Sequence, residues 1–200
     1  MGEKMTDLSY VDYVKRRAQS NPCINGLTQY LERQAACASN IVKVDYPNAL
    51  FTSSLDPIRV EVQDLPELVH AVPSATTRFL LIEDINPQLI AFLGKALDID
   101  PIFFADYVNT CFENIEVAAP PPSLAILPSL LSQHGYLHLH YQQVLSLGDA
   151  KAFEDVAYAL KTHTNITRNI RRLAPLSGIQ LALVRASCAL LMREINDARV

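Results

Sequence analysis

The fold is indicated most clearly by residues 78–108, which read RFLLIEDINPQLIAFLGKALDIDPIFFADYV. The run at 79–82 is continuously apolar and bounded by charged residues, a pattern typical of a strand buried on both faces. Asn86-Pro87 supplies a helix cap and a first-turn proline, which predicts a helix through residue 97. Asp98-Ile99-Asp100, called the acidic corner below, ends that helix, and the proline after it begins another. We therefore expect a strand, a helix, a tight corner and a second helix.

Upstream of this stretch, helix and strand patterns alternate. Thr6 is a suitable cap for a first helix of about 14 residues, and Asn21-Pro22 ends it. The other predicted elements are a helix over 27–38, strands over 41–46 and 58–63, and a short helix over 67–71.

Downstream, the segment AAPPPS at 118–123 predicts a stiff surface connection and an internal seam. Ser177 and Gln180 match a capping box, which predicts a final helix of about 20 residues. The other predicted elements are a long strand over 137–147 and a helix over 150–162.

Together these elements predict an α/β fold, namely a single layered α/β/α domain over residues 1–200 with a central mixed sheet and a long C-terminal helix. The final helix would be apolar around much of its circumference. Such a helix needs cover on more than one side, which favours an interaction module or a homo-oligomer.

Composition and charge limit the classes of function. Half of the 200 residues are hydrophobic and 19% are charged, which suits a folded domain. The formal net charge of −4 argues against a protein that mainly binds nucleic acid. The four cysteines form no C-x-x-C pair, so we expect buried small hydrophobes in a reducing compartment. Because no secretory pattern opens the sequence and no apolar run reaches about 18 residues, we expect a cytoplasmic protein.

Carboxylates gather between residues 83 and 116, where Lys95 is the single cation. Mg²⁺ prefers oxygen ligands and keeps several waters, so one or two carboxylates are enough to bind it. Asp98 and Asp100 are the first candidate pair, with Glu83 and Asp84 as further candidates. The alternative is that these residues cap helices or lie on a solvated face.

Two histidines, His138 and His140, lie on the same side of the strand predicted at 137–147, with Tyr136 beside them. Two imidazoles in that spacing form half of a transition-metal site. The alternative is a solvated or hydrogen-bonded pair on a strand surface. No G-x-S-x-G motif or glycine-rich phosphate loop is present in the sequence.

A basic group at Arg168, Arg171 and Arg172 is a candidate for holding an anion or an acidic surface. The alternative is a solvated helix face with one inward ion pair.

Residues 93–108 resemble the helix-corner-helix of the cytosolic domain of CorA-like magnesium transporters, which also follows a strand. Segments 127–129, 139–142 and 164–173 extend the likeness to the soluble part of fungal CorA-like proteins, over about residues 75–190. Transporters of this family end in two membrane helices joined by a Gly-Met-Asn loop, and this sequence contains neither. The resemblance implies an α/β/α cytosolic domain that meets a membrane only through segments absent from this chain.

Two main functions follow from these features. The first is a non-enzymatic, divalent-cation-responsive domain of a CorA-like transporter or a soluble relative, which binds Mg²⁺ and forms a homo-oligomer. The second is a free-standing soluble metal-assisted hydrolase, lyase or cyclase that uses His138, His140 and Tyr136. No organic cofactor is expected in either case.

Overall fold

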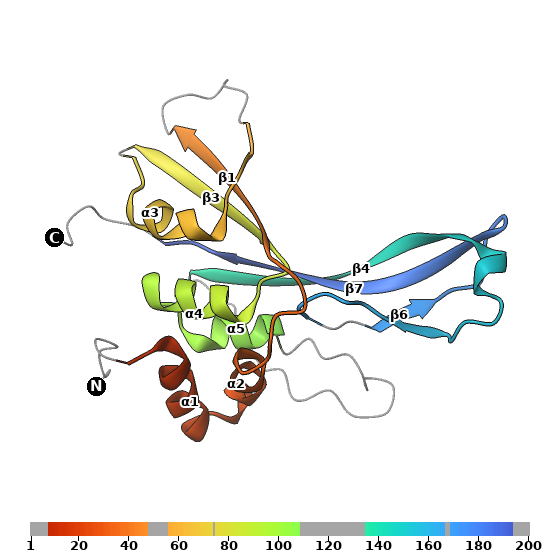
Figure 1. Cartoon of the computed structure of the whole chain (residues 1–200), viewed down its shortest axis with the longest axis horizontal. Helices are drawn as coiled ribbons and strands as arrows, with labels where there is room; N and C mark the ends of the chain where they lie inside the picture. The colour runs from red at the N-terminus through yellow and green to blue at the C-terminus, as the bar shows by residue number, and fades with distance from the viewer. Residues whose placement is uncertain (1–7, 48–55, 74, 109–134, 167–168, 194–200) are drawn as a thin grey trace. The chain divides into compact units, whose positions relative to one another are not determined.

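The computed structural model describes residues 8–47, 56–73, 75–108, 135–166 and 169–193 (Figure 1). The chain forms two compact units, an N-terminal unit of residues 1–105 with 193–200 and a C-terminal unit of residues 106–192. Helices occur together with two antiparallel sheets, which confirms the predicted mixed α/β class but not the single mixed sheet. The seam predicted at 118–123 lies outside the described residues.

The sheet of the N-terminal unit has three antiparallel strands in the order β2-β1-β3. The predicted strand at 41–46 is confirmed as β1 (Asn40–Pro47), which pairs along its whole length with β3 (Thr76–Glu83). The strand predicted at 58–63 is reduced to β2 (Ile58–Arg59). The chain then enters the 3-10 turn η2 (Val62–Asp64) and α3 (Leu65–His70), which begins slightly earlier than predicted.

The prediction that the strand at 79–82 is buried on both faces is wrong. Burial alternates along β3, and the side chains of Phe79 and Leu81 are 48% and 56% exposed. An antiparallel sheet commonly has one covered face and one exposed face, and β3 follows that pattern in spite of its apolar sequence.

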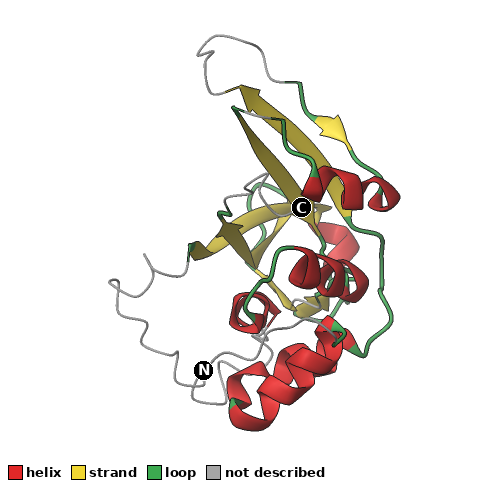
Figure 2. Cartoon of the chain, turned by 90° about the vertical axis from the view of Figure 1, so that its left-hand side faces the viewer, coloured by secondary structure: helices red, strands yellow, loops and turns green. Residues whose placement is uncertain are grey.

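The helices α1 (Tyr10–Ser20), α2 (Asn25–Leu31), α4 (Pro87–Ala96) and α5 (Pro101–Val108), labelled in Figure 1, lie together, and Figure 2 draws the helices in red. The helix α1 is capped by Ser9, whose hydroxyl oxygen accepts the Asp12 N–H at 3.1 Å, whereas the predicted cap, Thr6, lies outside the described residues. It ends as predicted, before the 3-10 turn η1 (Pro22–Ile24), but α2 stops well short of residue 38. The side chains that form the core of this group are Tyr10, Val14, Ile24, Leu27, Tyr30, Leu89, Ile90, Leu93 and Phe104.

The C-terminal unit is a four-stranded antiparallel sheet in the order β4-β7-β6-β5. Its strands are β4 (Tyr136–Asp149), β5 (Ala159–Lys161), β6 (Asn169–Arg172) and β7 (Ile179–Leu191). The strand predicted at 137–147 is confirmed as β4. The helix predicted at 150–162 is wrong, because that segment forms the 3-10 turn η3 (Ala150–Phe153) followed by β5.

The prediction of a long C-terminal helix is also wrong, because residues 179–191 form strand β7. The two residues before this strand explain why the chain does not begin a helix here. Ser177 and Gly178 have φ angles of 51° and 79°, and Leu176 and Ile179 exchange two backbone hydrogen bonds of 2.9 Å. Positive φ at both central residues is the geometry of a two-residue hairpin turn, so Ser177 turns the chain instead of capping a helix. Gln180 is buried, and its amide donates to the Leu173 carbonyl at 2.6 Å.

Candidate functional site

The acidic corner is a helix C-cap followed at once by a helix N-cap. Asp98 has a φ of 49°, the left-handed conformation in which many helices end. The Ile99 N–H donates to the Gly94 carbonyl at 3.0 Å and the Leu97 N–H donates to the Leu93 carbonyl at 2.9 Å. Asp98 thus has a backbone role at the end of α4, while its side chain is exposed.

Asp100 is the N-cap of α5. One of its carboxylate oxygens, Oδ1, accepts the Ile102 N–H at 2.9 Å, and the other, Oδ2, lies 4.0 Å from Arg17 Nη2. The side chains of Asp100 and Arg17 are each 43% exposed, so this ion pair is weak. The capping role that we weighed as an alternative is therefore present, and Oδ2 still faces solvent.

Tyr10 fastens the corner to α1. Its hydroxyl donates to the Ile99 carbonyl at 3.0 Å, and its ring meets the Phe104 ring edge-on with the centroids 6.2 Å apart. Burial raises the pKa of the Tyr10 phenol far above its ordinary value, and the carboxylates of Asp100 and Asp98 raise it further. Both carboxylates therefore lie near enough to the buried hydroxyl to act on its ionisation.

Glu83 and Asp84 form a second acidic pair, between β3 and α4. Glu83 Oε2 accepts the Asn40 amide at 2.9 Å, and the Asp84 carbonyl accepts the Ser39 hydroxyl at 2.8 Å. The ten residues of α4 separate this pair from the acidic corner, a distance of ~15 Å at ~1.5 Å per residue. The structure does not unite the four predicted metal ligands in one site. Among the described residues, no three His, Cys, Asp or Glu side chains are grouped so as to hold a metal ion.

The residues of the enzyme alternative lie on β4. Tyr136 and His138 are in contact, with ring centroids 5.4 Å apart and the rings edge-on. His138 lies opposite Ala189 on β7 and His140 lies opposite Ser187. The His140 side chain lies outside the described residues. A metal role for this pair stays a prediction.

The arginines of the predicted basic group do not form one cluster. Arg171 and Arg172 are neighbours on β6, so their side chains lie on opposite faces of the sheet, and Arg168 lies outside the described residues. The Arg172 guanidinium donates to the Val156 carbonyl at 2.6 Å and lies over the Tyr158 ring. It holds the segment between η3 and β5, so its role is structural.

An ion pair that was not predicted from the sequence stabilises the N-terminal sheet. Arg78 Nε and Nη2 donate to the two carboxylate oxygens of Asp45 at 2.6 and 2.9 Å, and Nη1 donates to the carbonyls of Leu68 and Ala71. The hydrogen bond from Arg78 lowers the pKa of Asp45. Two features of the sequence could have indicated this ion pair. Asp45 lies in the strand predicted at 41–46, and Arg78 directly precedes the apolar run at 79–82.

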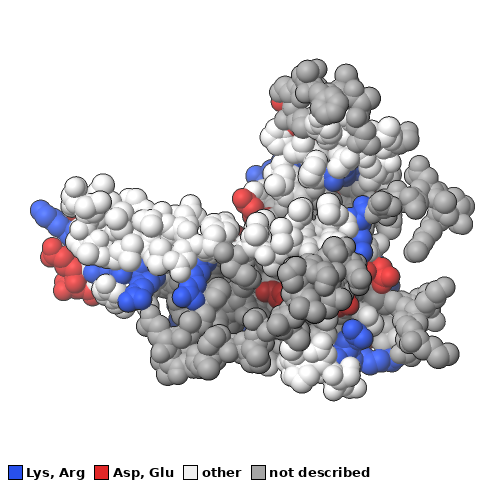
Figure 3. Space-filling model, turned by 180° about the vertical axis from the view of Figure 1, so that it is seen from behind, with Lys and Arg blue, Asp and Glu red and all other residues white. Residues whose placement is uncertain are grey.

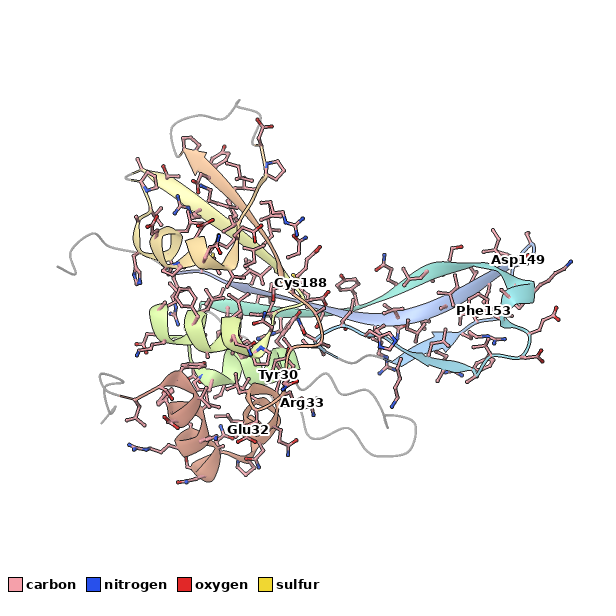
Figure 4. The ribbon with its side chains drawn as sticks, in the orientation of Figure 1. Tyr30, Glu32, Arg33, Asp149, Phe153 and Cys188 are labelled. Carbon is pink, nitrogen blue, oxygen red and sulfur yellow. The ribbon has the colours of Figure 1, made fainter. Side chains whose placement is uncertain are left out.

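The cysteines also differ from the prediction. Cys23 and Cys188 are exposed and Cys37 is half-buried, so they are not buried core residues. Figure 4 labels Cys188, which lies on β7. Cys111 lies outside the described residues.

No described helix combines the length and the apolar character needed to cross a membrane. No protein-family model, curated protein or solved structure matches this chain.

Proposed function

We propose that this chain is a non-enzymatic, cytoplasmic domain of the CorA-like type, which binds Mg²⁺ at the acidic corner and forms a homo-oligomer. The observation that carries the proposal is the corner itself, where Asp98 and Asp100 lie two residues apart in the link between α4 and α5 and both side chains are accessible to solvent. The order of β3, α4, corner and α5 is the one on which the family resemblance rests.

The chemistry of the corner suits a hydrated magnesium ion better than a dehydrated one. Among the described residues, no third His, Cys, Asp or Glu side chain joins these two carboxylates, so water would fill most coordination positions of a bound ion. Mg²⁺ gives up water reluctantly and is commonly bound by one or two carboxylates. Binding would also offset the repulsion between two like charges.

Thermal unfolding of the whole chain with and without Mg²⁺ tests the proposal. At ~10 mM MgCl₂, a dissociation constant of ~1 mM would stabilise the folded state by ~1.4 kcal/mol, which corresponds to several degrees in Tm. NaCl at equal ionic strength controls for charge screening.

The matched variants are Asp98→Asn and Asp100→Asn, singly and together. Asparagine tolerates the left-handed conformation at residue 98 and caps a helix as well as aspartate does at residue 100, so the corner keeps its backbone while losing its charge. Glu67→Gln, at an exposed position of α3, is the control for a charge removed elsewhere. The double variant should lose the Mg²⁺ response and Glu67→Gln should keep it. No rise in Tm for the unmodified chain, or an equal rise in the double variant, would refute the cation site.

A further inference from the structure

The four-stranded sheet of the C-terminal unit has two very different edges. On one side the edge strand is β5, which has three residues and includes Lys161. On the other it is β4, which has 14 residues and, among the described strands, pairs only with β7. Short strands and lysines are the usual means of preventing edge-to-edge pairing, so β5 is protected in a way that β4 is not.

The stretch 139–147 of β4 reads LHYQQVLSL and contains no Lys, Arg, Asp, Glu or proline. Leu139, Tyr141 and Val144 are 54%, 51% and 56% exposed, and Gln142 and Gln143 are exposed as well. The only irregularity in the pairing of β4 with β7 comes later, between Ser146 and Gly148. Figure 3 shows the surface of this unit white along most of the side where Figure 1 places β4.

We infer that β4 is a dimerisation edge, and that its partner is β4 of a second copy of this chain, paired antiparallel about a two-fold axis normal to the sheet. The inference rests on the homo-oligomer of the proposed function and names the surface that forms it. It requires no metal and no contact with the acidic corner.

Three features favour a second copy over an unrelated strand. A typical strand of ~5–6 residues would leave part of this edge unpaired, whereas a second β4 has the same length. A strand without charges can face itself without like-charge repulsion. A two-fold axis normal to the sheet keeps each face on its own side. With Gln142 opposite its own copy, Leu139 then lies opposite Leu145 of the second copy, an apolar pair on one face.

The first test is sedimentation equilibrium of the whole chain. One strand pair is a small interface, so we expect dissociation in the micromolar range and would measure from ~1 to ~500 µM. Gln142→Lys places two ammonium groups opposite each other at the centre and should weaken dimerisation at least tenfold. Ala157→Lys adds the same charge in an exposed loop of the same unit and should leave the dimer unchanged. Circular dichroism establishes that both variants fold.

The second test is a cysteine cross-link. Residues directly opposite each other on antiparallel strands have Cα atoms ~4.5–5.5 Å apart, within the range of a disulfide. Gln142→Cys should therefore form an intermolecular disulfide at residue 142, identified by mass spectrometry among those of the native cysteines. Ser146→Cys is the control, since its own copy would lie ~27 Å away at ~3.4 Å per residue.

The outcomes separate the two proposals. A chain that stays monomeric up to ~500 µM overturns both the edge and the homo-oligomer, whatever the Mg²⁺ response. A dimer that Gln142→Lys does not weaken, or that cross-links equally through residue 146, overturns the edge alone. An unmodified chain that shows no Mg²⁺ response but forms a Gln142-sensitive dimer overturns the cation site alone.

Discussion

Gly94→Ala should destabilise the N-terminal unit even though alanine favours helices. Gly94 lies in α4, and a Cβ atom built on it would lie 2.3 to 2.5 Å from three ring atoms of Tyr10. The ring cannot simply move aside, because it is buried, packs on Phe104 and donates its hydroxyl to Ile99. The substitution therefore has to displace α1 from α4 or push Tyr10 out of its site.

The opposing terms can be compared from the structure. Alanine gains ~1 kcal/mol over glycine within a helix. Overpacking a close-packed core costs ~1–3 kcal/mol, and loss of the Tyr10 hydrogen bond to Ile99 adds ~1 kcal/mol. The net expectation is a loss of ~1–3 kcal/mol in the free energy of unfolding.

Urea unfolding followed by far-UV circular dichroism measures this loss, since the chain has no tryptophan to report it by fluorescence. The same substitution made in a Tyr10→Leu background removes the ring atoms that clash. There Gly94→Ala should cost at least ~1 kcal/mol less, which a double-mutant cycle reports as coupling. A Gly94→Ala protein as stable as the parent, or equal costs in the two backgrounds, would refute the packing of Tyr10 on Gly94.

Other predictions concern single residues, and urea midpoints over a pH series check them together. Arg78→Gln leaves the Asp45 carboxylate with the Lys43 ammonium, 3.3 Å away, as its cationic partner, and it also removes the Arg78 hydrogen bonds to Leu68 and Ala71; it should cost ~1–3 kcal/mol at neutral pH. Because Arg78 lowers the pKa of Asp45, the parent should lose this stability as the pH falls below ~4, and the variant should show a smaller acid dependence; equal acid profiles would contradict the pair. Gly178→Ala should cost ~1–2 kcal/mol, since φ is 79° and no atom lies within 4 Å of the new Cβ; a neutral result would contradict the hairpin turn. The parent should lose stability above pH ~10, where the unfolded phenol of Tyr10 ionises and the buried one does not, and Tyr10→Phe should reduce that loss.

The stretch 78–108 was predictable because its signals are local. Asn86 caps α4 by accepting a 2.8 Å hydrogen bond from the Leu89 N–H. Asp100 caps α5 by accepting a 2.9 Å hydrogen bond from the Ile102 N–H. Caps and first-turn prolines act over three or four residues, so the sequence alone reveals them. The exposure of Phe79 and Leu81 was not predictable in this way, because it depends on which elements cover the sheet.

The C-terminal third shows where local signals fail. Residues 179–191 are rich in Leu and Ala, which favour helix, yet β7 pairs with β4 on one side and β6 on the other. Pairing on both edges outweighs propensities of a few tenths of a kcal/mol per residue. Ser177 before Gly178 was ambiguous, since serine suits both a helix cap and a turn, and only the positive φ angles decide between them.

The candidate site was predictable in part. The corner pattern identified Asp98 and Asp100, whereas the hydrogen bond from the Tyr10 hydroxyl to the Ile99 carbonyl joins residues 89 positions apart in the sequence. A contact at such separation leaves no periodic trace. The Arg78–Asp45 ion pair was not predicted for the same reason, since its two residues lie far apart in sequence and come together only when β1 pairs with β3.

The turn at Ser177 and Gly178 also bears on the order in which the C-terminal sheet assembles. Closing a loop of two residues costs little chain entropy, so β6 and the start of β7 can pair early in folding. The pairing of β4 with β7 spans far more chain, from Asp149 opposite Ile179 out to Tyr136 opposite Leu191, and so we expect it to form later, on a hairpin already in place. Folding chains in which β4 pairs slowly would expose the edge of β7 as a template, so the pairing of β4 with β7 is the step at which misassembly competes with folding.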